Sequence, residues 1–259
     1  MSHSLLWPAL HALSWRGLLF LLAVLLLGGL VKGVVSIGVP LVAMPLLAGT
    51  LSIRQAVLLL SLPIILGNIP QALEGGHTLP TIRRVAAPMI GMVAGIMLGV
   101  SILLRLSPRM EAGGAGLILV IASALLLASP RLHLPRHLAA PFGLALGFVS
   151  GLMEGMAAIP GPLLAMYLLA IGATGRQFTK QIALILIVSV IALILTFRQN
   201  HHADGFDLAI SALAAVPVIG GIIIARPLRD MLSPRLFRVV VLIFVLLAGL
   251  NMIRKSGLI

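Results

Sequence analysis

The chain of 259 residues contains no cysteine, which excludes disulfide bonds, thiol chemistry and cysteine-ligated metal sites. It is also poor in charged and in aromatic residues, which make up 9% and 4% of the sequence. Only 6 acidic residues oppose 18 lysines and arginines, and these basic residues stand at the ends of apolar runs rather than in one stripe. We therefore predict that they anchor loops to membrane lipids, and we predict no nucleic-acid partner. A Walker motif is also absent, so we expect no ATP hydrolysis.

Hydrophobic residues, by contrast, make up 60% of the chain, and the mean hydropathy of +1.19 predicts an integral membrane protein. A spanning helix needs about 20 apolar residues. Eight apolar segments follow one another, at residues 17–48, 56–73, 85–104, 113–128, 139–171, 182–197, 208–225 and 239–253. We expect an all-α polytopic fold, because the alternating pattern of barrel strands is absent. The first residues lack the pattern of a cleavable signal peptide, so the first span is expected to remain.

Two of these segments, 17–48 and 139–171, are too long for one span and too short for two. Each carries glycine and proline near its middle, where proline cannot continue a helix. We interpret each as a broken helix or a helical hairpin. The second also has glycine at every fourth position, a pattern that favours close helix packing, at Gly143, Gly147, Gly151 and Gly155.

The two long segments are copies of each other. A shift of 122 positions places GLVKGVVSIGVPLVAMPLLAGTLSIRQ (29–55) on GLMEGMAAIPGPLLAMYLLAIGATGRQ (151–177) without a gap, with 13 of 27 residues identical. Two looser echoes follow in the same order, AAPMIG (86–91) as AAVPVIG (214–220) and LSPR (106–109) as LSPR (232–235). We therefore divide one membrane domain into two homologous repeats, 1–132 and 133–259, an arrangement typical of secondary transporters.

Each repeat contains a broken helix or hairpin plus about three further helices. If the hairpin limbs count as two crossings, the second repeat is inverted relative to the first; if the hairpin is re-entrant, the repeats are parallel. The numbers of Lys and Arg on the two sides are too similar to decide. We favour inversion, because paired broken helices that face each other at the bilayer midplane are its usual product.

The duplication aligns two opposite charges, Lys32 and Glu154, each directly before a glycine. About 15 helical residues at 1.5 Å each carry Lys32 past the bilayer centre, where an uncompensated charge costs at least about 2.5–3.5 kcal/mol. Such a residue needs a partner or a wet cavity. Two interpretations remain open. In the first, Lys32 is structural: it snorkels to the interface or pairs with Glu154 to lock the repeats together. In the second, Lys32 attracts an anion in a central cavity, while Glu154 pairs with it or takes up a proton.

The stretches SIGVP (36–40) and AIPGP (158–162) mark the two breaks. A new helix is expected to begin near the last proline of each stretch, so that its free N–H groups and the positive end of its dipole point into the protein. Two such helix N-termini face to face would form a small anion site. The predicted substrate site therefore comprises Lys32, Ser36 as a hydroxyl donor, Gly38, Pro40, Gly161 and Pro162.

Four other polar side chains are candidates for the transport path. Asn68 and Gln71 lie three residues apart on one helix face and are expected either to line a polar path in the site or to bond a neighbouring helix. Arg54 and Arg176 occupy equivalent positions in the two copies, as interfacial anchors or as gates that meet the anion. The loop RQNHHADGFD (198–207) holds histidine and aspartate without a third ligand at a recognised metal-site spacing. We predict a solvated loop and no metal site.

Several of these motifs together resemble one known family. A glycine-rich break followed by P-L-x-A-x-P-L-L (40–47), a G-x-x-x-G … I-x-G-P break (151–162) and an N-x-x-Q helix (68–71) are similar to the TauE/SafE family of sulfite exporters. The PMIGMVAG and PVIGG helices extend the resemblance over nearly the whole chain. It implies a multi-span carrier without cofactors that exports sulfite, organosulfonates or related small anions. The family's usual glycine is replaced here, which implies a narrower pocket, at Ser36, Ala157 and Ala158.

The leading hypothesis is a secondary transporter, not an enzyme, that exports a small sulfur-containing anion by alternating access of its two halves, with proton coupling through Glu154. An anion channel would share the same site. An intramembrane lipid pyrophosphate phosphatase would need several acidic or hydroxyl groups, whereas Glu154 alone among the acidic residues lies clearly inside a predicted span. The expected location is a cell membrane, as a multi-pass protein of a bacterial inner membrane. The expected partners are the anion, membrane lipids and a second copy of the chain in a homodimer.

Overall fold

The computed structural model describes residues 4–35, 39–74, 78–128, 133–231 and 234–257. These residues form helices and, within the described ranges, no strand, so the predicted all-α class is confirmed. The helices are α1 (Trp7–His11), α2 (Trp15–Val35), α3 (Val39–Leu47), α4 (Ile53–Leu73), α5 (Thr78–Arg84), α6 (Ala86–Leu103), α7 (Pro108–Ala128), α8 (Arg136–Ala157), α9 (Gly161–Ala170), α10 (Gly175–Gln199), α11 (Gly205–Met231) and α12 (Pro234–Ser256).

Eight of these helices are long and apolar enough to cross a membrane, namely α2, α4, α6, α7, α8, α10, α11 and α12. Each overlaps one of the eight apolar segments of the sequence, which confirms a multi-pass membrane protein. Helices α3 and α9 have 9 and 10 residues. At 1.5 Å per residue neither can cross a hydrocarbon core about 30 Å thick by itself. The short helices α1 and α5 lie outside the predicted segments.

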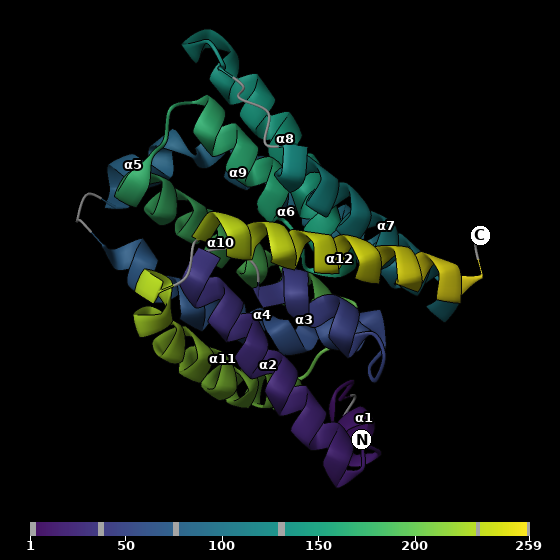
Figure 1. The fold of residues 1–259 in the computed structure, drawn as a ribbon. Helices are drawn as coiled ribbons and strands as arrows, with labels where there is room; N and C mark the ends of the chain where they lie inside the picture. Colours follow the sequence, from purple (N-terminus) through teal and green to yellow (C-terminus); the bar gives the residue numbers. More distant parts are fainter. Residues whose placement is uncertain (1–3, 36–38, 75–77, 129–132, 232–233, 258–259) are drawn as a thin grey trace.

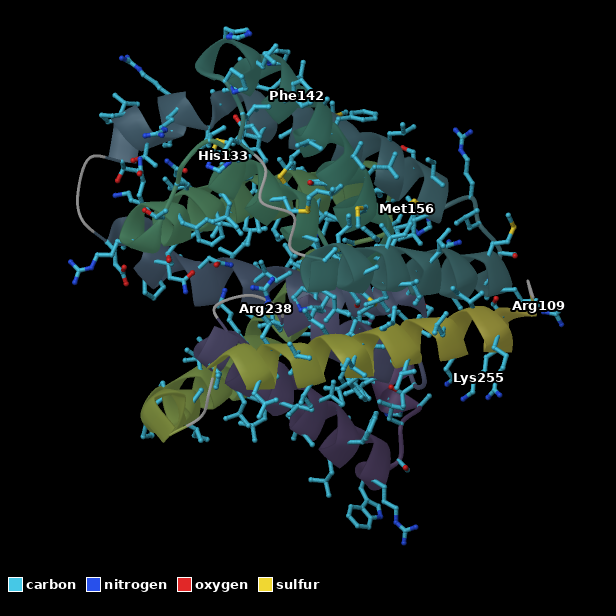
Figure 2. The ribbon with its side chains drawn as sticks, turned by 45° about the horizontal axis from the view of Figure 1, so that its top comes forward. Arg109, His133, Phe142, Met156, Arg238 and Lys255 are labelled. Atoms are coloured by element: carbon cyan, nitrogen blue, oxygen red, sulfur yellow. The ribbon has the colours of Figure 1, made fainter. Side chains whose placement is uncertain are left out.

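Helices from the first half of the chain pack mainly on helices from the second half (Figure 1). The five principal pairs are α6 with α8, α2 with α11, α4 with α11, α4 with α10, and α7 with α12. The last pair is antiparallel. Arg238 near the start of α12 donates to the carbonyl oxygen of Leu126 near the end of α7, at 3.1 Å. Figure 2 shows that Arg109 near the start of α7 and Lys255 near the end of α12 lie together at the other end of this pair.

Glycines bring the backbones of α6 and α8 into direct contact. A Cβ atom on Gly95 of α6 would lie 2.0 Å from the carbonyl oxygen of Phe148. One on Gly151 of α8 would lie 2.2 Å from the carbonyl oxygen of Met92. Real Cβ atoms do not approach so closely, so these positions require glycine. The close-packing role that the four-residue glycine spacing predicted for α8 is therefore confirmed.

The loop before α11 differs from the solvated loop that we predicted. Asp207, in the first turn of α11, is fully buried. Its carboxylate accepts hydrogen bonds from the Ser4 hydroxyl at 2.6 Å and from the N–H groups of Leu5 and Leu6 at 3.0 and 2.8 Å. It also accepts one from the N–H of Asp204 at 3.2 Å. The residues before α1 therefore fold back onto the start of α11, which the local sequence of the loop does not reveal.

Replacing Asp207 with asparagine is expected to lower stability, because the new amide nitrogen would face N–H groups from which the carboxylate now accepts hydrogen bonds. Hydrogen bonds to charged groups contribute about 1.5–3 kcal/mol each, so we expect a loss of about 2 kcal/mol in the free energy of unfolding. The thermal midpoint of the purified protein in detergent measures this loss. Asp204→Asn is the control, because the Asp204 carboxylate accepts one bond, from the N–H of Asp207 at 2.9 Å. Equal losses in both variants would contradict the prediction.

Candidate functional site

Both glycine- and proline-containing stretches of the duplication lead into a short helix. In the second repeat, α8 ends at Ala157, and Ala158 adopts the left-handed conformation with φ 55°. Helix α9 then begins at Gly161, with a proline as its second residue. In the first repeat α2 ends at Val35 and α3 begins at Val39, again with a proline second. Ser36 and Gly38, two predicted substrate residues, lie outside the described residues.

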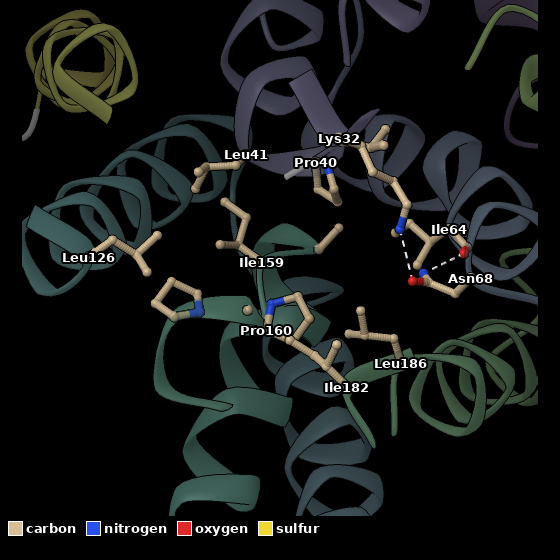
Figure 3. Close-up of a pocket in the computed structure, with 14 residues that line it drawn as sticks. Lys32, Pro40, Leu41, Ile64, Asn68, Leu126, Ile159, Pro160, Ile182 and Leu186 are labelled. Atoms are coloured by element: carbon tan, nitrogen blue, oxygen red, sulfur yellow. Dashed lines mark hydrogen bonds between the residues drawn. The ribbon is translucent and has the colours of Figure 1, made fainter. Parts of the chain in front are cut away.

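The starts of α3 and α9 border one cavity of about 50 Å³ (Figure 3). Five of the predicted site residues line it, namely Lys32, Pro40, Asn68, Gly161 and Pro162. The other lining residues are mainly aliphatic: Val39, Leu41, Ile64, Leu126, Ala158, Ile159, Pro160, Ile182 and Leu186. The sequence therefore predicted most of the polar lining, whereas Gln71 is not among the lining residues.

Lys32 is the charged group of this cavity. Its side chain is 6% exposed, and its Nζ donates to the Oδ1 atom of Asn68 at 2.8 Å. The Asn68 amide nitrogen in turn donates to the carbonyl oxygen of Ile64 at 2.7 Å, which keeps the amide oxygen turned toward Lys32 (Figure 3). Gly67 lies beside the lysine side chain, because a Cβ atom there would be 3.5 Å from Lys32 Cε, an ordinary van der Waals contact. A neutral acceptor thus holds the ammonium group without cancelling its charge.

Glu154, which the duplication aligns with Lys32, has a different partner. It is 1% exposed, and its Oε1 accepts from the Ser189 hydroxyl at 3.0 Å. Its other oxygen, Oε2, has no hydrogen-bond partner among the described residues, nor has the hydroxyl of Ser150, one turn earlier on α8. Within the described ranges the structure has no salt bridge between Glu154 and Lys32. The two charges are therefore held separately, Lys32 by Asn68 of α4 and Glu154 by Ser189 of α10.

Three buried polar residues of α8 and α10 were not among the predicted site residues. Ser150 and Ser189 accompany Glu154, as described above. Gln181 on α10 is fully buried, and neither its amide oxygen nor its amide nitrogen has a partner among the described residues. It directly precedes Ile182, which lines the cavity. The available signal was an uncharged polar side chain inside an apolar run for Ser150 and Ser189, and directly before one for Gln181.

The two arginines proposed as gates lie in different surroundings. Arg54, in the first turn of α4, forms a salt bridge with the buried Glu111 of α7, and its Nη2 donates to the carbonyl oxygen of Leu106 at 2.8 Å. These contacts tie the start of α4 to the connection between α6 and α7. Arg176, at the equivalent position in α10, is exposed. The contacts of Arg54 match the anchoring interpretation.

The electrostatics of the cavity favour an anion. The first N–H groups of a helix have no acceptor within the helix, and the helix dipole places partial positive charge there. Two helix starts and the ammonium group of Lys32 therefore act on the same small volume, and no carboxylate is among the described lining residues. Such a set of donors can hold an oxyanion by hydrogen bonds and charge together.

Comparison with known proteins agrees with this chemistry. The family model described as "Sulfite exporter TauE/SafE" matches residues 21–252, which is nearly the whole chain. No curated protein and no solved structure matches. The family consists of membrane transporters rather than enzymes, and its name specifies an anionic substrate such as sulfite. The chain belongs to the TauE/SafE family of sulfite exporters and is a multi-pass membrane transporter.

Proposed function

We propose that this transporter carries a small sulfur-containing anion, sulfite or a short organosulfonate, and binds it beside Lys32 in the cavity between α3 and α9. The observation that carries the proposal is the convergence of two helix starts and one buried ammonium group on one cavity without a lining carboxylate. The mainly aliphatic lining favours a ligand that has an apolar part beside its charged group, as a short organosulfonate does. Asn68 would orient Lys32 and donate no charge of its own.

We further propose that the two repeats are inverted and rock around this cavity. The helix pairs that join the two halves support this arrangement. If α2, α4, α6 and α7 are exchanged with their sequence equivalents α8, α10, α11 and α12, the pairs α2 with α11 and α6 with α8 replace each other, and α4 with α10 and α7 with α12 return unchanged. The pair α4 with α11 becomes α10 with α6, which also pack on each other. Each pair joins the two halves, so a relative movement of the halves changes these contacts together. That is the geometry alternating access needs.

The positions of helix ends support inversion as well. The N–H of Leu134, just before α8, donates to the carbonyl oxygen of Ala170 at 2.9 Å, so the second hairpin returns to the end at which it starts. Lys180 near the start of α10 donates to the carbonyl oxygen of Glu74 at the end of α4. The residues before α2, in contrast, bond to the start of α4, where the Gln55 amide donates to the carbonyl oxygen of Leu5 at 3.2 Å. The two repeats thus begin at opposite ends of α4.

Uptake of radiolabelled sulfite into proteoliposomes tests the proposed substrate and mechanism. A carrier should show saturable uptake that unlabelled sulfite and organosulfonates suppress and phosphate does not. Unlabelled substrate inside the vesicles should accelerate entry of the label, because exchange skips the slow return of the empty site. A channel would lack this acceleration. Absence of uptake with folded protein and any sulfur anion would overturn the proposed substrate class.

Proton coupling through Glu154 is the last part of the proposal. The unpartnered Oε2 atom and the nearby Ser150 hydroxyl support it, because a buried carboxylate with an open lone pair is a proton acceptor without a fixed counter-charge. Glu154 also lies near the end of α8, four residues before Ala158 of the cavity wall. Protonation there would change the charge close to the break in the second repeat.

Replacing Glu154 with glutamine is expected to abolish the stimulation of uptake by a pH gradient. Glutamine has nearly the same shape and can still accept from Ser189, but it does not exchange a proton at physiological pH. Uptake without a gradient should remain within about threefold of the original rate, a difference below about 0.7 kcal/mol. Glu74→Gln, which changes an exposed carboxylate at the end of α4, should keep the gradient response. An unchanged response in Glu154→Gln would exclude this coupling route.

A further inference from the structure

A second cavity, of about 460 Å³, lies at the end of the bundle where α5 leads into α6. In Figure 1 this end lies on the far side of the molecule from α1. Helices α5, α6, α8 and α9 and the segment before α8 form its walls, and none of its lining residues lines the cavity beside Lys32. The lining residues are Arg83, Arg84, Ala87, Leu134, Ala139, Ala140, Tyr167 and Ile171.

Two adjacent arginines give this cavity its charge. Arg83 and Arg84, the last residues of α5, are both exposed, and Arg84 Nη2 makes a long hydrogen bond of 3.5 Å to the carbonyl oxygen of Ile171. Ala87 lies in the first turn of α6, where backbone N–H groups and the helix dipole add partial positive charge. No carboxylate is among the described lining residues. The guanidinium groups are therefore available to a phosphate or another oxyanion, which they can bind bidentately.

The remainder of the cavity wall is mainly apolar, and two hydrogen bonds fix its position. The Tyr167 hydroxyl donates to the carbonyl oxygen of Ala139 at 3.0 Å, and the Leu134 N–H donates to the carbonyl oxygen of Ala170 at 2.9 Å. Leu79 of α5 and Phe142 of α8 are exposed, as expected for residues that face lipid. A ligand that fits such a cavity has a negative head and an apolar body, and it approaches from the plane of the membrane.

We propose that this cavity binds the phosphodiester headgroup of an anionic phospholipid, with Arg83 and Arg84 on the phosphate and the alanine and leucine surface against the glycerol and upper acyl chains. Basic pockets between transmembrane helices bind anionic headgroups in this way. A zwitterionic lipid carries its own cationic group and gains less from the two arginines. This site is separate from the proposed transport site and does not depend on it.

One short helix connects the two cavities. Gly161 and Pro162 at the start of α9 line the cavity beside Lys32, whereas Tyr167 and Ile171 at its end line the lipid cavity. A lipid bound at the end of α9 would hold the hairpin of α8 and α9 in place. Anionic lipid bound there is therefore expected to stabilise the protein.

The test measures thermal midpoints of the purified full-length protein in detergent with added phosphatidylglycerol or phosphatidylcholine. Phosphatidylglycerol should raise the midpoint by several degrees more than phosphatidylcholine does. The double variant Arg83→Gln, Arg84→Gln should lose at least half of this difference, and Arg83→Lys, Arg84→Lys should retain part of it. The matched control is Arg105→Gln, Arg109→Gln, a pair of exposed arginines after the opposite end of α6, which should behave like the unmodified protein. Native mass spectrometry should show correspondingly fewer bound phosphatidylglycerol molecules in the first variant alone.

Three results would overturn the proposal. The first is an equal gain from both lipids, which would show that the headgroup charge is not recognised. The second is an undiminished phosphatidylglycerol effect in the glutamine variant at positions 83 and 84. The third is equal protection by inorganic phosphate or sulfite without lipid, which would assign the cavity to a free oxyanion. Because sulfite uptake is measured separately, a failure of the lipid site leaves the proposed transport function untouched.

Discussion

Lys32→Met is expected to reduce anion uptake by about 10- to 100-fold, because a hydrogen bond from a charged donor contributes about 1.5–3 kcal/mol and each 1.4 kcal/mol is a factor of ten. Methionine has nearly the length of lysine and fills the same space beside Gly67 without the ammonium group. The two helix starts would remain in the cavity, so weak residual binding is expected. Initial uptake rates at several substrate concentrations measure the change, which should fall mainly on the apparent affinity.

The stability of this variant separates a binding role from a structural one. Lys32 bonds to a neutral amide rather than to a carboxylate, so its removal leaves no unpaired buried charge. The thermal midpoint of Lys32→Met should therefore stay the same or rise. The alternative of an ion pair with Glu154 predicts the opposite, a loss of stability that Glu154→Gln reverses in the double variant. That pattern would exclude our assignment of Lys32.

A control variant shows whether loss of any buried lysine would impair uptake. Lys180 is as buried as Lys32, at 6% exposure, but its Nζ donates to the carbonyl oxygen of Glu74, and it does not line the cavity beside Lys32. The folded fraction of Lys180→Met should keep its affinity for sulfite. If Lys180→Met and Lys32→Met lose affinity equally, the ammonium group of Lys32 is not the specific anion ligand.

Hydropathy alone predicts the spans of this fold, because a bilayer forces every backbone polar group into a helix or a closed barrel. The prolines likewise show where new helices begin, since Pro40 and Pro162 are each the second residue of a short helix. Lys32 and Asn68 were both predicted site residues, and they share one cavity. These features depend on local sequence, so the sequence is sufficient to predict them.

The partners of the buried charges could not be predicted in the same way. The duplication aligns Lys32 with Glu154, which suggests a pair, but equivalent positions in a repeat need not be neighbours in space. Lys32 meets Asn68 because α4 packs near α2, and Glu154 meets Ser189 because α10 reaches α8. Asp207 bonds to residues about two hundred positions away at the other end of the chain. Such contacts depend on the tertiary arrangement, which no periodicity in the sequence encodes.

Gly221→Ala is expected to lower the free energy of unfolding by about 3 kcal/mol or more, because it overpacks a closed helix contact. Its Cβ atom would lie 2.2 Å from the carbonyl oxygen of Leu26 and 2.7 Å from the nitrogen of Leu30, both backbone atoms of α2. A backbone cannot rotate away as a side chain can. Helices α2 and α11 would have to separate, and α2 carries Lys32. The thermal midpoint and the yield of monodisperse protein measure the effect.

The neighbouring residue gives a matched control on the same helix. A Cβ atom on Gly220 would have the Leu26 side chain as its nearest neighbour, at 3.8 Å, which is ordinary contact. Gly220→Ala should therefore be neutral or stabilise the protein by up to about 1 kcal/mol, through the higher helix propensity of alanine. Truncating the side chain with Leu26→Ala should not rescue Gly221→Ala, because the clashing atom belongs to the backbone. Rescue by Leu26→Ala, or equal midpoints for the two glycine variants, would show that α2 and α11 do not meet backbone to backbone at this position.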